Sequence, residues 1–252
     1  MKKHLCCIFS FIFLNLMNRG ESYHTAIDLT WPFNNKTISY GDGRRFELTK
    51  KTIVDTPDLW YRANEYASAE HAGTHMDAPA HFDVNGWKID EIPISYFLTA
   101  GIKIDLSNET MKYGSDARLK LEHIFDWQRR YGPIPYRSIM LIYFNWGQYY
   151  HDKLKYLGGE TLPEYKFPGM TEEAATWIRN CGKVLGVGVD TVSIDPNNGS
   201  AVHVIILKSK MIALENVRIP GPELPARGFQ LSVTPMYIEE GSGAPTRVIA
   251  YI

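Results

Sequence analysis

Two continuous apolar runs constrain the fold of this chain most strongly. Residues 138–144 (Ser-Ile-Met-Leu-Ile-Tyr-Phe) and 184–189 (Val-Leu-Gly-Val-Gly-Val) lack the polar alternation of a strand with one solvent face. Such runs are typical of strands that are buried on both faces. Segments with helical patterns lie beside them, at 116–132, 168–183 and 200–210. This alternation of strands and helices predicts an α/β fold.

The remaining segments complete one domain. Residues 101–107 alternate apolar and polar side chains, as a strand with one buried face does. Other strand-like segments end at Asp28 or cover 211–217, 228–239 and 246–252. The 252 residues contain no internal repeat or long linker, so we expect a single domain over residues 23–252. The formal net charge is -1 and no basic run occurs, which argues against nucleic acid as a partner.

The N-terminal segment has the pattern of a secretory signal peptide. Lys2 and Lys3 form a basic start, a mostly apolar run covers Leu5 to Met17, and small residues lie near Gly20. This run is too short to span a membrane comfortably. We therefore predict a signal peptide over residues 1–22 and a mature chain that is secreted or enters the secretory lumen, with no membrane association afterwards. An uncleaved anchor or a buried first helix is the alternative.

Potential N-glycosylation sites are consistent with the secretory pathway. Three Asn-X-Ser/Thr sequons would accept glycans there, at Asn35, Asn108 and Asn198. Such triplets also arise by chance, so they add only weak support for secretion. We expect a glycoprotein if the signal peptide is used.

The segment that carries the chemistry is 70–82, Glu-His-Ala-Gly-Thr-His-Met-Asp-Ala-Pro-Ala-His-Phe. It places three imidazoles and one carboxylate within eleven positions: His71, His75, Asp77 and His81. Imidazole is the commonest metal ligand in proteins, and carboxylates join it readily on divalent ions. A lone histidine is more often structural, but this density favours a metal site.

The local backbone can bring the first three of these groups together. The glycine and the proline within the segment argue against one regular helix. If residues 74–77 are extended, His75 and Asp77 point to the same face, because side chains alternate along a strand. His71 can then fold back onto them across a turn at Gly73. The two oxygens of Asp77 also allow it to bridge to a second ion.

His81 is not needed as a metal ligand and can transfer protons instead. Three protein ligands leave coordination positions for water, and a divalent ion can lower the pKa of bound water to about 7. His81 can lie beside that water, accept its proton as a general base and then protonate a leaving nitrogen. The segment therefore predicts a hydrolytic site with three groups that hold metal and one that moves protons.

This segment resembles the H-x-G-T-H-x-D-x-P-x-H-F signature of the cyclase-like metal hydrolases, the family that includes bacterial kynurenine formamidase and isatin hydrolase. Other segments that resemble the family follow in family order: 26–33, 64–71, 144–150, 167–178, 184–196, 214–217 and 243–250. The resemblance thus covers nearly all of residues 25–252. It implies a swivelling β/β/α domain whose mixed sheet closes partly into a barrel, and a homodimer whose partner completes the pocket.

The resemblance also implies site residues. It assigns His71, His75 and Asp77 to the first metal site. It assigns His81 to the role of catalytic acid/base. In two-metal members, a later His and Glu join the aspartate at a second ion, and His203 and Glu215 have the required separation of twelve positions. Whether these two bind metal or only contact the substrate stays open, because isatin-hydrolase-type members are similar to a one-metal design with manganese. The implied cofactor is Zn or Mn, one or two ions per subunit.

The chain departs from the family at the end of its central strand, where Thr-Gly-Trp or a close variant is common. Here the segment reads Phe-Asn-Trp-Gly, so Asn145 replaces a glycine and its side chain can project toward the pocket. Trp87, Trp60 and Tyr61 can supply aromatic walls for a flat substrate. For each of them an ordinary core or loop position is an equally good interpretation.

Two functions follow. The first is a metal-dependent amidohydrolase that opens the C–N bond of an aryl formamide like N-formylkynurenine or of a cyclic amide like isatin. The alternative is a secreted protein that keeps the fold and binds a ligand or partner without catalysis, although a binding protein has no need of a proton shuttle. Tryptophan catabolism, which produces kynurenine, is usually intracellular, so a secretory signal favours another natural substrate.

Overall fold

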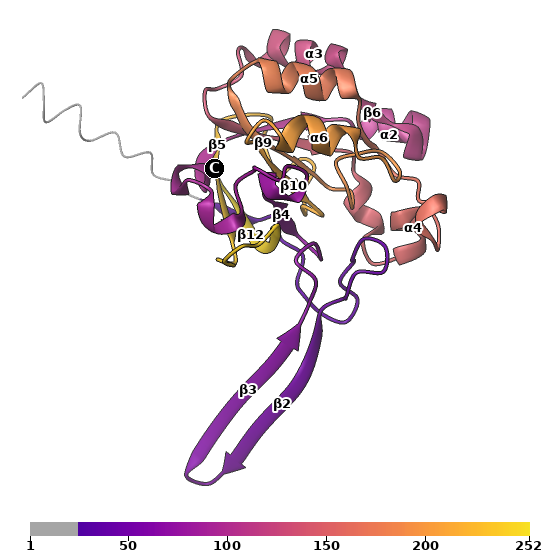
Figure 1. The fold of residues 1–252 in the computed structure, drawn as a ribbon. Helices are drawn as coiled ribbons and strands as arrows, with labels where there is room; N and C mark the ends of the chain where they lie inside the picture. The colour runs from indigo at the N-terminus through magenta and orange to yellow at the C-terminus, as the bar shows by residue number, and fades with distance from the viewer. Residues whose placement is uncertain (1–24) are drawn as a thin grey trace, which may run out of the picture.

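A computed structural model describes residues 25–252, so the predicted signal peptide lies outside the described residues. Its frame is one eight-stranded sheet (Figure 1). The strands follow the order β1 (Ala26–Asp28), β12 (Gly243–Tyr251), β11 (Phe229–Pro235), β5 (Leu98–Asp105), β7 (Ser138–Tyr143), β9 (Val184–Val189), β10 (Ile212–Glu215) and β4 (His75–Asp77). Because β4 also pairs with β12, the seven strands from β12 to β4 close into a barrel. The predicted α/β domain with a mixed barrel is confirmed, and its closure is complete rather than partial.

Four neighbouring strands of the barrel, β5, β7, β9 and β10, run parallel. Successive side chains of β7 enter two different cores, as expected of a strand buried on both faces. Met140 and Ile142 pack with the helices, whereas Ile139 and Leu141 pack with residues of the antiparallel strands, such as Leu231. The two apolar runs of the sequence are therefore strands of the barrel wall.

The helices of the described residues are short. They are α2 (Ser107–Tyr113), α3 (Leu121–Tyr131), α4 (Lys153–Leu157), α5 (Glu172–Asn180) and α6 (Ala201–Leu207). Single 3₁₀ turns are η1 (Pro79–His81), η2 (Ile89–Glu91), η3 (Ile94–Tyr96), η4 (Gly114–Asp116), η5 (Trp146–Tyr149) and η6 (Leu162–Glu164). Figure 1 shows α3, α5 and α6 on one side of the sheet. Within residues 25–252 no helix combines the length and the apolar character that a membrane span needs.

One predicted helix is shorter than expected. The helical pattern begins at residue 116, but the backbone at Arg118–Leu119 forms β6, which pairs in parallel with β8 (Gly169–Met170). The carbonyl of Leu119 accepts hydrogen bonds from the backbone N–H and the hydroxyl of Thr171. This tertiary pairing keeps the first residues of the segment extended.

A long hairpin projects from the domain (Figure 1). It consists of β2 (Glu47–Thr56) and β3 (Leu59–Ala67), and most of its side chains are exposed. The sequence analysis did not predict it. Its exposed large apolar side chains are Leu48, Ile53, Leu59, Trp60, Tyr61 and Tyr66. The second strand ends four residues before His71, so the hairpin leads directly into the predicted metal segment.

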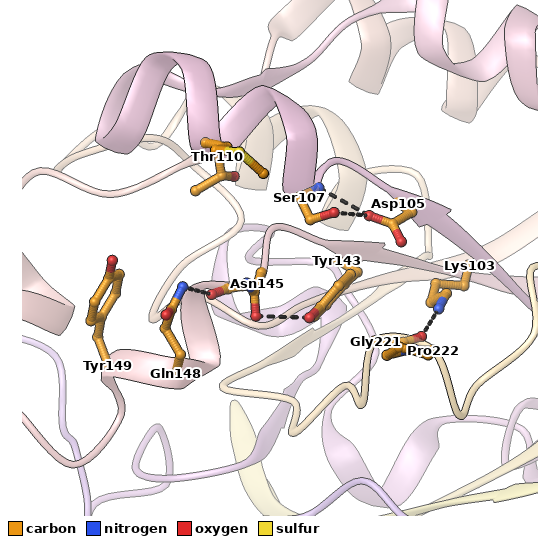
Figure 2. A pocket seen from close by; sticks show the side chains of 11 residues that line it. Lys103, Asp105, Ser107, Thr110, Tyr143, Asn145, Gln148, Tyr149, Gly221 and Pro222 are labelled. Atoms are coloured by element: carbon orange, nitrogen blue, oxygen red, sulfur yellow. Dashed lines mark hydrogen bonds between the residues drawn. The ribbon is translucent and has the colours of Figure 1, made fainter.

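A cavity of about 750 Å³ lies at the carboxyl ends of β5 and β7, beside α2 (Figure 2). The hydroxyl of Tyr143 donates to Oδ1 of Asn145 over 2.8 Å, and the ammonium of Lys103 donates to the carbonyl of Gly221. No histidine of the signature segment lines this cavity.

Candidate metal centre and active site

The register of β4 brings two predicted ligands and an acid from another strand together. His75 lies opposite Glu215 of β10, and Asp77 lies opposite Ala213. Side chains two residues apart share a face, and so do directly opposite residues of antiparallel neighbours. All three polar side chains therefore project to the same side, and each is at least 95% buried, since His75, Asp77 and Glu215 are 2%, 0% and 5% exposed.

A turn at Gly73 returns His71 to this group. Gly73 has a φ of +59°, and a Cβ there would lie 2.8 Å from the ring of Phe33. The turn places Nδ1 of His71 2.7 Å from Oδ1 of Asp77. This is the fold-back geometry that the spacing of the segment predicts.

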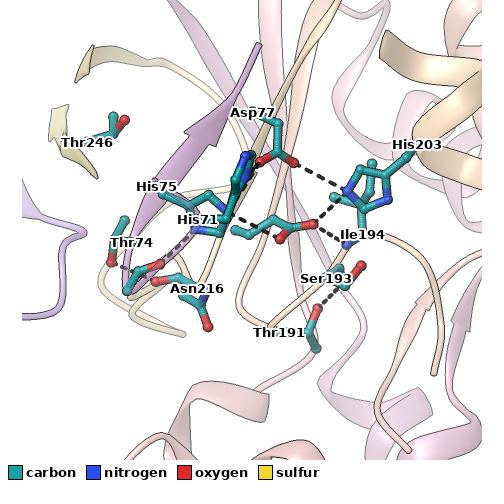
Figure 3. Close-up of polar contacts among 12 residues, drawn as sticks. His71, Thr74, His75, Asp77, Thr191, Ser193, Ile194, His203, Asn216 and Thr246 are labelled. Atoms are coloured by element: carbon teal, nitrogen blue, oxygen red, sulfur yellow. Dashed lines mark hydrogen bonds and ion pairs between the residues drawn. The ribbon is translucent and has the colours of Figure 1, made fainter. Parts of the chain in front are cut away.

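His203 reaches the other side of Asp77 from α6. Its Nε2 lies 3.1 Å from Oε1 of Glu215 and 3.3 Å from Oδ2 of Asp77. Nε2 of His75 lies 3.2 Å from Oδ1 of Asp77 and 3.5 Å from Oε2 of Glu215. Figure 3 shows the imidazoles on both sides of the Asp77 carboxylate. The structure thus brings all five predicted ligand residues together, with Asp77 at the centre.

Outer hydrogen bonds fix which nitrogen of two imidazoles faces the group. Nδ1 of His75 lies 2.9 Å from the carbonyl of Gly73, and Nδ1 of His203 lies 2.6 Å from Oδ2 of Asp195. Both partners are acceptors, so each Nδ1 carries a proton and each Nε2 is the ring nitrogen that faces the carboxylates. Lone pairs that face carboxylates repel them unless a cation or a proton lies between.

The donor set fits a divalent cation. Nε2 of His75 and Oδ2 of Asp77 are buried and have no hydrogen-bond partner within the described residues. Buried polar atoms without partners are costly, and a bound cation satisfies both at once. Two sets of ligand atoms lie within 4.8 Å of one another, and Asp77 belongs to both: His71, Asp77 and His81, and His75, Asp77 and Glu215. Imidazole with carboxylate oxygen suits Zn and Mn.

The pKa shifts within the group also favour a bound cation. Burial disfavours the charge of Asp77, but the adjacent imidazoles of His203, His71 and His75 outweigh it and hold the pKa of Asp77 well below its usual range. Asp77 is therefore ionised at neutral pH. Burial opposes the charge of His203 too, yet its contacts with Asp195, Asp77 and Glu215 raise its pKa well above the usual value. In the absence of metal, these carboxylates therefore favour the protonated, positively charged form of the His203 imidazole.

His81 differs from the other imidazoles of the site. It ends the 3₁₀ turn that begins at Pro79, and its ring stacks on His71 with centroids 4.0 Å apart. Partial desolvation, and then the neighbouring imidazoles of His71 and His203, lower the pKa of His81 to about 4. Its ring makes no hydrogen bond to any residue from 25 to 252. It is a neutral imidazole that ring contacts hold in place, without a hydrogen bond to a described residue.

A cavity of about 300 Å³ opens over the group. Its polar lining includes His71, His81, His203 and Glu215. Tyr40 and Phe82 add aromatic walls, and Phe82 stacks on His203 with centroids 4.8 Å apart. The sequence analysis named neither wall residue nor Asp195, although Phe82 is the last residue of the signature.

The predicted substrate-binding residues do not line the cavity over the metal group. Trp87 packs edge-on against Tyr96, with the ammonium of Lys210 over its ring. Trp60 and Tyr61 begin the second strand of the hairpin and are 63% and 50% exposed. The structure brings none of these three rings into the cavity of the same chain.

Asn145 is also turned away from the cavity over the metal group. Its backbone has a φ of 58° and a ψ of 25°, the left-handed conformation, and its side chain bonds to Tyr143 instead. The N–H groups of the two residues that follow donate to Asp190, which fixes this turn. Asn145 therefore lines the separate cavity of Figure 2.

Comparisons with known proteins agree with this geometry. The family model named Cyclase matches residues 27–196. The isatin hydrolase of Roseibium aggregatum is 23% identical over 218 residues, which are 82% of this chain and 81% of that protein. The kynurenine formamidase of Paracidovorax citrulli is 27% identical over 200 residues, 77% of this chain and 81% of that protein.

A solved structure has the same fold. Isatin hydrolase A from Labrenzia aggregata, bound to benzyl benzoate, superimposes with a TM-score of 0.81 at 26% identity. The match covers 90% of this chain and 93% of that one. The barrel and its helices are therefore shared with an enzyme of known structure.

Proposed function

Because this chain belongs to the Cyclase family of metal-dependent hydrolases, we propose that it is an amidohydrolase acting on a C–N bond other than a peptide bond. The observation that carries this proposal is the buried group around Asp77, where Nε2 of His75 and Oδ2 of Asp77 have no hydrogen-bond partner among the described residues. The substrate is an aryl formamide like N-formylkynurenine or a cyclic amide like isatin. The names of the relatives, isatin hydrolase and kynurenine formamidase, support this class.

The cofactor is Zn or Mn, one or two ions per subunit. His71, His75 and Asp77 would hold the first ion, and His203 and Glu215 would hold a second one together with Asp77. When bound, such an ion polarises a carbonyl and lowers the pKa of water toward 7. The protein contributes ligands that are buried and already oriented by their outer hydrogen bonds.

His81 is the general acid/base. At neutral pH its imidazole is uncharged, because its pKa is lowered to about 4, so it can accept a proton. It lines the cavity beside His71, and no hydrogen bond to a described residue holds its ring. It takes the proton from the attacking water and delivers it to the leaving nitrogen. Tyr40 and Phe82 hold the flat substrate between aromatic walls.

The active assembly is a homodimer. An isolated two-stranded hairpin is only marginally stable in water, yet β2 and β3 form one that exposes a set of apolar side chains. A second copy of the chain would cover these side chains. Trp60 and Tyr61 would then line the cavity of the partner rather than that of their own chain, which is consistent with their distance from it.

The mature protein is secreted or resides in the secretory lumen. The basic and apolar pattern of residues 1–22 supports this location. All three sequon asparagines are exposed, namely Asn35, Asn108 and Asn198, so each is accessible for a glycan. The natural substrate is then an aromatic amide of that compartment.

An assay with isatin and N-formylkynurenine tests the function. We expect purified wild type to contain a divalent metal and to hydrolyse at least one of the two compounds. His81→Ala should keep the metal and lose about 10²- to 10⁴-fold in kcat, because general acid–base catalysis contributes that much. His151→Ala is the matched control, since His151 packs edge-on against Trp31 and lies outside the group.

Two results would count against the proposal. A metal-loaded wild type that opens neither compound would favour the non-catalytic binding protein on the same fold. A fully active His81→Ala variant would remove His81 from the mechanism.

A further inference from the structure

His71 is held differently from the other two imidazoles that face Asp77. Its Nδ1 lies 2.7 Å from Oδ1 of Asp77, and its Nε2 lies 3.1 Å from the hydroxyl oxygen of Ser242. His75 and His203 have the opposite arrangement, because their Nδ1 atoms face outward to Gly73 and Asp195. The outward nitrogen of His71 is Nε2, and its partner is a hydroxyl that can either donate or accept.

Glu70 decides which role that hydroxyl takes. The hydroxyl of Ser242 donates to Oε2 of Glu70 over 2.7 Å. The same carboxylate oxygen accepts the backbone N–H groups of Ser242 at 3.1 Å and of Gly243 at 3.3 Å. A hydroxyl has one proton, so Ser242 has only lone pairs left for His71. Nε2 of His71 must therefore carry a proton and donate it to Ser242.

We propose that Glu70 and Ser242 are positioning residues that keep a proton on Nε2 of His71 and hold this nitrogen outward, so that Nδ1 is its metal-binding atom. This inference rests on the metal site of the proposed function. Glu70 directly precedes His71, and Ser242 directly precedes β12, whose first residue lies opposite Asp77. The pair thus joins two distant segments of the chain behind the ring and leaves Nδ1 directed at the carboxylate of Asp77.

The tautomer can be measured in the metal-free protein, without any assay of activity. Long-range ¹⁵N–¹H spectra of ¹⁵N-histidine protein report which ring nitrogen carries the proton, and His71→Gln assigns the signal. We expect Nε2 to carry a proton in wild type and in Ser242→Thr, which keeps the hydroxyl. Ser242→Ala should lose this proton in part of the molecules, and Glu70→Gln should lose it further, since an amide can donate to the hydroxyl and the hydroxyl can then donate to Nε2.

Metal affinity gives a second measurement. In competition with a chelator, Ser242→Ala and Glu70→Gln should bind Mn²⁺ or Zn²⁺ about tenfold more weakly, as expected for loss of an outer ligand contact. Ser242→Thr should match wild type. Ser232→Ala is the control, because within residues 25–252 this hydroxyl hydrogen-bonds to Thr234, on the exposed side of β11 and away from the metal group.

The inference is overturned if Nε2 of His71 carries no proton in wild type, or if Ser242→Ala changes neither the proton on Nε2 nor the affinity. Should Ser242→Ala lose its cooperative melting transition, Glu70→Gln tests the same prediction. Failure of wild type to bind either ion would reject the proposed metal site, whereas the spectra of the metal-free protein would still judge the role of Glu70 and Ser242.

Discussion

The absence of a side chain at Gly243 leaves the space in which His71 lies. A Cβ at Gly243 would approach Cε1 of His71 to 2.4 Å and both ring nitrogens to 2.9 Å. Real Cβ atoms do not come so close to another heavy atom, so either the ring or the strand would have to move. Gly243 is paired with Asp77 between β12 and β4, and the ring is therefore confined between two strands.

Replacing this glycine should weaken the metal site. We expect Gly243→Ala to lower the affinity for Mn²⁺ or Zn²⁺ at least about tenfold, because the displaced ring loses its ligand position. Titration of the metal-free variant measures the effect. Gly147→Ala is the control, since the nearest atom to a Cβ there is 3.6 Å away, on Trp31. Equal affinities for Gly243→Ala and wild type would show that His71 is not a ligand.

Local sequence predicted the centre of the site but not its surroundings. His71, His75 and Asp77 belong to one short segment, so strand alternation and one glycine turn were enough to predict that they meet. His203 could be assigned only through the family resemblance, because its place depends on how α6 packs on the barrel. Asp195 was missed for the same reason, since its contact with His203 forms across the loop after β9.

Asp190 joins two strands at their carboxyl ends. It follows β9, and its carboxylate accepts the N–H groups of Phe144, Trp146 and Gly147, which follow β7. Burial raises the pKa of Asp190 to about 6, although these N–H groups oppose the shift. The connection therefore depends on a carboxyl group that titrates at about pH 6 in the folded protein.

This connection predicts a specific dependence of stability on pH. A carboxyl with a raised pKa binds its proton more tightly in the folded state, so its contribution to the free energy of unfolding is full below the unfolded pKa of 3.8 and is lost as the pH rises through about 6. Relative to Asp190→Asn, wild type should lose about 2 kcal/mol of stability between about pH 4 and about pH 7. Urea unfolding at several pH values measures this difference. A difference that stays constant over this range would contradict the raised pKa.

Strands and helices that pack in the hydrophobic core were predicted better than those that lie outside it. The buried runs became β7 and β9, and the helical pattern at 168–183 contains α5, which begins after Thr171, whose hydroxyl caps it by accepting the N–H of Ala174. The hairpin of β2 and β3 was missed because neither hydrophobic core of the described residues includes any part of it. Its apolar side chains follow no pattern that burial within one chain would impose.

The whole molecule combines a closed barrel with an exposed hairpin that lies outside both hydrophobic cores of residues 25–252. Closure through β4 and β12 leaves the barrel without free edges and buries the metal group in its wall. The hairpin adds no residue to the core, so its length is not explained by the stability of one chain. This separation lets a variant test assembly without disturbing the site.

We expect Trp60→Ser combined with Tyr61→Ser to weaken the dimer at least about a hundredfold, because buried aromatic anchors dominate interfaces. Sedimentation or light scattering over a dilution series measures the molar mass, and the metal content should stay that of wild type. Val84→Ser is the control, as Val84 is 98% exposed and lies outside the hairpin. A wild type that is monomeric at all concentrations would refute the proposed dimer.

Calorimetric titration of the metal-free protein with Mn²⁺ and Zn²⁺ tests the central claim most directly. We predict that wild type binds at least one ion per chain and releases protons as it does so. Asp77→Asn should bind at least about a hundredfold more weakly, since the shared carboxylate contacts His71 of one set and His75 of the other. A wild type that binds neither ion, or an Asp77→Asn variant that binds them equally well, would contradict the account.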